Sequence, residues 1–502
     1  MTGIVLFTSG LVVSPFEQHS VSSLMNFYES LSMANASQSK IFRRSLKAFP
    51  ALGLALLVTF TYGQHSITKI PLPDKQEADA IQVINFGEEL FVAYNLKFPK
   101  PKTNPFHFYW VTEGLVEEVD FPELKGKLIS CITRDSLHNY FHYFEEENKL
   151  ISLGVIKENR LTGKKETCSP TTVDGRLIGI TGSKERVFIY SFEKKAYSLK
   201  VTEKVNDKIV NESLYGLSFD LSKFKGSDIA FVPEGSFIGT AQASARIKVF
   251  AGPEHIRITF DDPFDEHASS LQNNYRTTLV DINTRTGAVS NKMFTEASKG
   301  NFRSFPFSKY LFRTVMWGKE FTLQMFDVEK GELVSTKKIV NDKKYKEQKV
   351  FLREGLRNRI SQTETLSNMI QSSWACVPFV VVDKDVQTDS SAIVTWGTYY
   401  NGHGVQALPL PSVMGLMIMA VGTAIRQIAE GPGLSRYFYL RGSSKEQFQI
   451  INDVDLVRSR IDFFELAHLH FDLTRKGYFH SSESVIGTYF DEVNSELWLV
   501  EF

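Results

Sequence analysis

Short segments in which apolar and polar residues alternate recur along most of the chain, and they predict β-strands. Typical examples are KLISCITRD, ERVFIYSF, EFTLQMFDV and SAIVTWGTYY, all rich in β-branched and aromatic side chains. Turn-forming residues such as glycine, asparagine and aspartate bound these segments. Helical periodicity is scarce before residue 340. The pattern therefore predicts an all-β chain.

One hairpin-like string recurs along the sequence. It consists of an apolar strand end, a polar turn and an alternating strand, as in YFEEENKLISLG, YSFEKKAYSLKV, LVDINTRTGAVS, FDVEKGELVSTK and FDEVNSELWLVEF. Phe144 and Phe192 in these strings are 48 positions apart, and Val280 and Phe326 are 46 positions apart. A period of about 40 to 50 residues made of short strands is typical of four-stranded propeller blades. We interpret each string as the third and fourth strands of one blade.

On these repeats the chain resembles the broad β-propeller superfamily, with WD40-like and quinoprotein-like repeats, over roughly residues 75–502. The resemblance implies one propeller domain at 64–502, in which blades pack on one another because a single blade cannot bury both faces of its sheet. The expected number is seven four-stranded blades, with six or eight as alternatives. WD40 signatures are not regular here. Asp281, Thr286 and Gly287 match the quinoprotein motif only with one extra residue.

Two stretches interrupt the repeat. Residues 341–373 are polar with weak helical character, and we interpret them as a connection between blades. Within a second insertion at 405–432, residues 412–430 predict a helix that is continuously apolar or small at 413–425. That run is too short to span a bilayer. A helix that is hydrophobic on all sides must be covered, so it either packs across a propeller mouth or docks to a partner subunit or membrane surface.

Residues 1–63 predict a leader. Basic residues between positions 43 and 47 precede an apolar run at 48–60, which is the order of a secretory signal peptide. Cleavage is predicted after Gly63, and Met33 is an alternative start that gives a leader of normal length. The sequence thus predicts export to the periplasm, cell envelope or extracellular space, with no transmembrane span in the mature chain.

Charge and cysteine content narrow the choice of partners and scaffolds. The chain has 57 basic and 57 acidic residues, so it lacks the basic field that non-specific nucleic-acid binding needs. Nucleic acid is not an expected partner. Three cysteines are too few for a disulfide-stapled scaffold. Either Cys131 and Cys168 pair, or the cysteines are buried free thiols.

An acidic segment is one candidate site. The string DDPFDEH concentrates Asp261, Asp262, Asp265 and Glu266 in one predicted loop. Clustered carboxylates bind calcium or position a general base. The alternative, which we favour, is a solvated acidic turn.

Histidines form a second candidate. The string HLHFD places His468, His470 and Asp472 at alternating positions, so on a strand they would share one face and could ligate zinc. The alternative is a polar strand face. His138 and His142 have the same parity, and we interpret them as one wet face of a blade strand.

Catalytic and cofactor motifs do not appear in the sequence. It contains no G-x-S-x-G elbow, P-loop, H-E-x-x-H or C-x-x-C string. No cofactor is predicted, apart from the calcium or zinc considered above. The sequence favours an exported, non-catalytic propeller that binds a protein, peptide or glycan. The alternative is a propeller enzyme, a hydrolase or lyase acting on a glycan or peptide, because propeller active sites are assembled from distant loops.

Overall fold

The structure, a computed structural model, describes most of the chain from residue 66 onward. The described ranges are 66–72, 77–86, 89–96, 106–121, 124, 129–147, 150–183, 185–224, 228–234, 236–263, 274–297, 300–342, 345–354, 359–373, 376–384, 391–400, 434–443, 447–451, 456–468, 473–480 and 484–502. The predicted leader at 1–63 and the predicted helix at 412–430 lie outside them. Within these ranges, no helix is long and apolar enough to cross a membrane.

The described strands form seven sheets, here called blades 1 to 7, and four of them are simple antiparallel meanders. Blade 2 contains β2 (Ala78–Phe86), β3 (Glu89–Leu96), β4 (His107–Thr112) and β5 (Leu115–Val119). Blade 3 contains β6 (Ile129–Arg134), β7 (His138–Glu147), β8 (Leu150–Asn159) and β9 (Lys165–Thr172). Blade 4 contains β10 (Arg176–Ser183), β11 (Arg186–Glu193), β12 (Ser198–Val205) and β13 (Lys208–Gly216). Blade 6 contains β19 (Asn301–Phe307), β20 (Tyr310–Trp317), β21 (Glu320–Asp327) and β22 (Leu333–Val340).

Blades 5 and 7 have more than four strands. Blade 5 contains β14 (Ile229–Pro233), β15 (Ile247–Ala251), β16 (His255–Pro263), β17 (Asn274–Asn283) and β18 (Val289–Ala297), and β14 runs parallel to β15. Blade 7 contains β23 (Lys349–Glu354), β24 (Arg359–Thr365), β25 (Val377–Lys384), β26 (Ala392–Tyr400), β27 (Leu434–Gly442) and β28 (Gln449–Ile451). The stretch 341–373, interpreted above as a connection, therefore supplies β23, β24 and the helix α4 (Leu366–Ser372) to blade 7.

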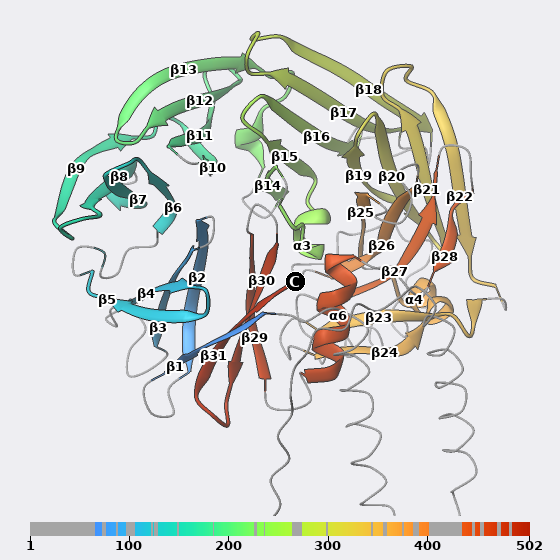
Figure 1. Cartoon of the computed structure of the whole chain (residues 1–502). Coiled ribbons are helices and arrows are strands. Elements are labelled where there is room, and N and C mark those ends of the chain that lie inside the picture. The colour runs from blue at the N-terminus through green and yellow to red at the C-terminus, as the bar shows by residue number, and fades with distance from the viewer. Residues whose placement is uncertain are drawn as a thin grey trace, which may run out of the picture. The chain divides into compact units, whose positions relative to one another are not determined.

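Blade 1 joins the two ends of the described chain. Its strands β29 (Leu473–His480), β30 (Val485–Asp491) and β31 (Glu496–Glu501) pair in order, and the N-terminal strand β1 (Ile67–Pro71) pairs with β31 (Figure 1). Strands of neighbouring blades contact each other, as β29 does with β2, β6 with β10, β16 with β19 and β19 with β25. The predicted all-β propeller is confirmed, and the described strands form seven blades, the number expected.

The recurring hairpin string occupies more than one place in a blade. The strings at Val280 and Phe326 connect the last two strands of blades 5 and 6, as predicted. Those at Phe144, Phe192 and Phe490 instead connect β7 to β8, β11 to β12 and β30 to β31. The interpretation as third and fourth strands is wrong for these three, because every tight turn of an antiparallel meander favours the same residues.

The hydrophobic core lies between neighbouring blades. Phe91 of blade 2 and Phe141 of blade 3 have ring centroids 5.3 Å apart, and Phe250 of blade 5 lies 5.4 Å from Phe305 of blade 6. The second strand of blade 4, β11, is buried on both faces from Val187 to Phe192, whereas the outermost strand β13 is mostly exposed. Burial on both faces explains why the inner strands read as continuous apolar runs.

A buried polar cluster links blade 7 to blade 1 through α6 (Val457–His468). Arg353 of β23 donates from Nη1 to Glu465 Oε2 at 2.6 Å and from Nη2 to Asp462 Oδ1 at 2.5 Å. Tyr437 and Tyr439 of β27 donate to the two oxygens of Asp462, each at 2.6 Å. From blade 1, Tyr478 of β29 donates to Glu465. We call these six residues the closure cluster.

The closure cluster contains two carboxylates around one guanidinium in a water-excluded site. Asp462 and Glu465 are fully buried. Burial raises the pKa of the Asp462 carboxyl, and the charge of Arg353 opposes that rise. Hydrogen bonds from Tyr437 and Tyr439 also oppose the rise in the Asp462 pKa, so this buried carboxylate depends on Arg353 and on the two hydroxyls.

Removing the guanidinium should destabilise the fold strongly. In Arg353→Met, both carboxylates stay buried without their cation, so we expect the free energy of unfolding to fall by about 3 to 5 kcal/mol. Asp462→Asn should cost less, because it leaves the Arg353–Glu465 pair and keeps polar partners for the tyrosines. Urea denaturation measures both.

Lys338→Met is the matched control, because Lys338 pairs with Glu320 on the surface of blade 6 at 2.7 Å. Its cost should stay within about 1 kcal/mol. An Arg353→Met protein that is as stable as this control would contradict the role given to the closure cluster.

Candidate functional site

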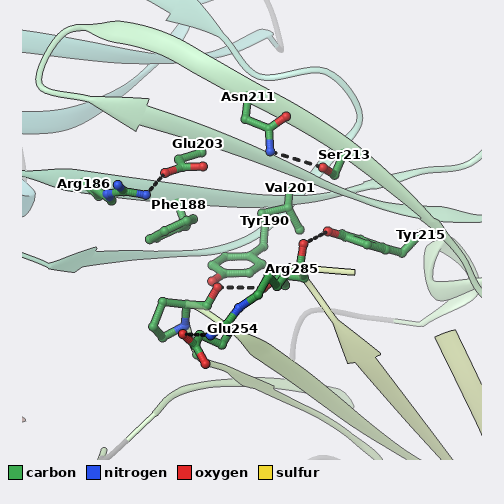
Figure 2. A pocket seen from close by; sticks show the side chains of 13 residues that line it. Arg186, Phe188, Tyr190, Val201, Glu203, Asn211, Ser213, Tyr215, Glu254 and Arg285 are labelled. Carbon is green, nitrogen blue, oxygen red and sulfur yellow. Dashed lines mark hydrogen bonds and ion pairs between the residues drawn. The ribbon is translucent and has the colours of Figure 1, made fainter. Parts of the chain in front are cut away.

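A pocket of about 500 Å³ lies between blades 4 and 5. Figure 2 shows the side chains that form its walls. One wall is the face of β11, β12 and β13, and the other consists of the β15–β16 and β17–β18 turns of blade 5. The lining residues are Arg186, Phe188, Tyr190, Val201, Glu203, Asn211, Ser213, Tyr215, Gly252, Pro253, Glu254, Thr284 and Arg285. We call this pocket the interblade slot.

Strand alternation places the blade 4 residues on one face. Arg186, Phe188 and Tyr190 are two positions apart on β11, so their side chains point the same way. Cross-strand pairing extends this face across the sheet. Phe188 pairs with Glu203, which pairs with Asn211, and the next row is Tyr190, Val201 and Ser213. The slot wall therefore follows directly from the register of three strands.

The deep end of the slot is aromatic and buried. Tyr190 is 1% exposed and Tyr215 is 4% exposed, and both belong to the hydrophobic cluster between blades 4 and 5. Burial raises the pKa of Tyr190 to about 12, so its phenol stays neutral. The Tyr215 hydroxyl donates to the Thr284 carbonyl at 3.4 Å, which links the outer strand of blade 4 to a turn of blade 5.

The open end of the slot carries two ion pairs, one on each wall. Arg186 Nη1 donates to Glu203 Oε1 at 2.6 Å, and the Arg186 side chain is 60% exposed. On the opposite wall Arg285 pairs with Glu254, and both side chains are more than half exposed. Figure 2 shows both pairs facing the slot. The four charges sum to zero, so the slot offers donors and acceptors without a net field.

The lining residues provide groups for hydrogen bonding but no arrangement for nucleophilic catalysis. None of the thirteen is a histidine, cysteine or aspartate. The Ser213 hydroxyl accepts from Asn211 Nδ2 at 3.5 Å, and an amide cannot act as its general base. Both glutamates are bound by arginines. The slot is thus suited to holding a polar ligand between two walls.

The prediction of an acidic loop is wrong for its first residue, Asp261. This aspartate lies on β16 and is fully buried. Its Oδ1 accepts from Thr277 Oγ1 at 2.9 Å and from Ser304 Oγ at 2.6 Å, and its Oδ2 accepts from Ser304 N at 2.9 Å. Lys248 Nζ, also fully buried, lies 3.7 Å from Oδ2, and burial lowers the pKa of this lysine to about 8. Asp261 therefore connects blade 5 to blade 6 instead of forming a solvated turn.

The remaining acidic candidates do not form a described cluster. Asp262 is also on β16, and its Oδ2 accepts from Arg276 Nη2 at 2.7 Å. Asp265 and Glu266 lie outside the described residues. Because Asp261 and Asp262 are neighbours on a strand, their side chains point to opposite faces of the sheet. These two carboxylates therefore cannot share one ligand.

The prediction of a histidine-bearing strand face is wrong for His468. This residue ends the helix α6 instead of lying on a strand. Its ring stacks on Phe464 at 4.2 Å between centroids, and its Nδ1 donates to the Phe464 carbonyl at 2.8 Å. His470 and Asp472 lie outside the described residues. Among the residues that are described, no group of three or more histidine, cysteine, aspartate or glutamate side chains could hold a metal ion.

Blade 3 shows whether Cys131 and Cys168 pair. Cys131, His142, Val155 and Cys168 lie side by side on β6, β7, β8 and β9. Three strand spacings of about 4.8 Å separate the two cysteines, too far for a disulfide. Both are free thiols.

The wet strand face expected at His142 is wrong. His142 is fully buried, and burial lowers its pKa to about 3, with a smaller contribution from Lys204.

None of the slot residues was a candidate from the sequence. The available signal was the polar-to-aromatic alternation in ERVFIYSF, which places Arg186 on the same face as Phe188 and Tyr190. That alternation identifies a strand face that changes from wet to buried along its length. It does not identify the turns at Glu254 and Arg285 that form the second wall.

The two neighbouring aspartates of β16 should respond differently to removal. Asp261→Ala leaves buried Lys248 without its counter-charge and the Ser304 amide without its acceptor, so we expect a loss of about 3 to 5 kcal/mol in unfolding free energy. Asp262→Ala breaks a partly exposed pair and should cost about 1 kcal/mol or less. Urea denaturation compares them, and equal costs would contradict the structural role of Asp261.

No protein-family model matches the sequence, and no curated protein matches it significantly. The β-propeller domain of the trilobed protease from Pyrococcus furiosus is similar in structure at 6% identity, with a TM-score of 0.35, over 86% of this chain and 94% of that domain.

Two further solved structures are similar to this chain at comparably low sequence identity and TM-score. Acylaminoacyl peptidase from Pyrococcus horikoshii has 7% identity and a TM-score of 0.32 over 84% of this chain and 51% of the peptidase, so the chain spans about half of that enzyme. The WD40 domain of SCAP from fission yeast has 8% identity and a TM-score of 0.26 over 66% and 95%. Enzymes and a WD40 domain thus both occur among the similar structures, and none of them specifies a ligand for this chain.

Proposed function

We propose that the protein is a non-catalytic β-propeller binding module and that its ligand binds in the interblade slot. The supporting observation is the composition of the slot walls. Exposed groups of Arg186, Asn211, Glu254 and Arg285, together with the half-buried Glu203, surround the opening, and no serine or threonine of the lining is paired with a base. Such a lining is suited to orienting a polar ligand through hydrogen bonds and ion pairs.

The packing beneath the slot also supports binding. Phe188 and Tyr190 are buried beneath the opening, so the polar groups of blade 4 are held by strands whose positions are fixed by packing. The Tyr215–Thr284 hydrogen bond joins the two walls. Because the backbone of these strands is fixed before a ligand arrives, less conformational entropy is lost when it binds.

Filling the slot tests this proposal. Asn211 is exposed on β13, and Asn211→Trp would place an indole ring in the opening. Ligands selected from arrays of oligosaccharides and short peptides should lose roughly tenfold or more in affinity, about 1.4 kcal/mol, measured by fluorescence polarisation.

The matched control is Thr336→Trp, which adds the same ring at an exposed position of β22, the outer strand of blade 6. This variant should bind as the wild type does. Equal affinity of the two tryptophan variants would place the binding site elsewhere. Turnover of a glycan or peptide in a hydrolase screen would favour the enzyme alternative.

We also propose that the protein is exported, with cleavage after Gly63. The supporting pattern is the basic segment at 43–47 followed by the apolar run at 48–60. N-terminal sequencing of the protein recovered from the culture medium or the cell envelope should begin at Gln64. An intact chain in the cytoplasm that starts at Met1 or Met33 would contradict export.

A further inference from the structure

The outer edge of blade 4 is a strand with room for a partner. Among the described strands, β13 pairs only with β12, so its other edge is open. This strand also contributes Asn211, Ser213 and Tyr215 to the interblade slot. The geometry points to an extended peptide as the ligand, which would add to β13 as a fifth strand while its side chains enter the slot. This inference rests on the proposed binding role of the slot.

Backbone hydrogen bonding shows which groups of β13 are available. Leu217 N donates to Tyr197 O at 2.8 Å, just beyond the pair formed by Ser198 and Gly216. Hydrogen-bonded and non-hydrogen-bonded pairs alternate along an antiparallel ladder. Asn211, Ser213 and Tyr215 therefore direct their backbone groups to β12. The N–H and C=O groups of Glu212 and Leu214 point to the open edge.

The side chains of β13 specify the pattern of a matching peptide. Leu214 is 58% exposed and Ile209 is 48% exposed, and their partners on β12 are Lys200 and Lys204. Both therefore lie on the face opposite the slot. A peptide strand beside β13 shares its pleat, so its alternate residues would face the slot and the exposed leucine. The ligand should carry polar residues on the slot side and apolar residues on the other side.

A peptide fits these features better than a glycan. The aromatic rings of the slot are Phe188, Tyr190 and Tyr215, and each is less than a tenth exposed. They leave little ring surface on which a sugar could stack. The open edge instead presents backbone donors and acceptors flanked by exposed apolar side chains, which is the surface used when a peptide extends a sheet.

The slot supplies the side-chain contacts of this complex. Arg186 and Glu203 on one wall, and Arg285 and Glu254 on the other, can each exchange partners with a charged peptide side chain. Asn211 lies in β13 itself and can donate and accept at the same time. Main-chain bonding would supply affinity, and the slot would select the polar residues of the peptide.

The test begins with a phage-displayed library of random linear decapeptides, selected on the full-length protein. A decapeptide is long enough to cover β13, which at about 3.4 Å per residue extends roughly 30 Å. Selected peptides should alternate polar and apolar residues. Their affinity should fall about tenfold or more for Leu214→Pro, because proline removes an outward N–H, worth up to about tenfold, and restricts the edge.

Three comparisons separate backbone pairing from misfolding and from side-chain loss. Leu214→Ala keeps the N–H and should lose only a few-fold in affinity. Thr336→Pro is the matched control, because the Asn341 N to Lys319 O bond places Thr336 at an outward position of β22 in blade 6. It should bind normally. N-methylation of alternate amides in the selected peptide should reduce binding to the wild type about as much as Leu214→Pro does.

The outcomes distinguish this inference from the proposed function. If selected peptides bind equally to Leu214→Pro and tolerate N-methylation in either register, strand addition is wrong. If no peptide is selected but an oligosaccharide binds and is lost in Asn211→Trp, the slot is a binding site and the peptide inference is wrong. If ligands of either class are unaffected by Asn211→Trp, the proposed function itself fails.

Discussion

Closure of the ring of blades depends on the interaction of Arg353 with Asp462 and Glu465. These residues belong to blade 7 and to α6, and Tyr478 carries the contact into blade 1. Blade 1 is itself completed by β1 pairing with β31, so the first and last described strands share one sheet. In a closed series of sheets each blade has two neighbours. A weak contact at the closure would expose apolar faces on both sides of the gap.

The other blades are held together mostly by apolar packing, and polar groups appear where that packing is interrupted. Between blades 5 and 6, Asp261 is satisfied by Ser304 and Thr277 and is buried. Between blades 4 and 5, the same kind of boundary changes from aromatic at Tyr190 to charged at Arg186 and opens into the slot. The Asp261 arrangement is structural because both carboxylate oxygens have protein partners. The other leaves exposed groups that a ligand can bind.

The sequence predicted the strands and the number of blades because both depend on local information, namely alternation within a strand and residue choice at turns. It failed where a residue's environment depends on partners far away in the chain. The sequence around Asp261 predicted a solvated turn. In the structure Asp261 is buried, and Ser304 of the next blade donates a hydrogen bond to its carboxylate. His468 fitted a strand pattern but ends a helix stacked on Phe464. The slot needs the register of three strands together with turns at Glu254 and Arg285, which no short motif encodes.

The most direct test of the account is amide hydrogen exchange of the wild-type protein, resolved by residue, with and without a selected peptide. Strand addition predicts that the amides of Glu212 and Leu214, which point away from β12, become protected when the peptide binds. The amides of Asn211 and Ser213 should already be protected in the free protein, because they bond within the sheet. Protection that appears only in another blade, or no change at Glu212 and Leu214 in a saturated complex, would contradict it.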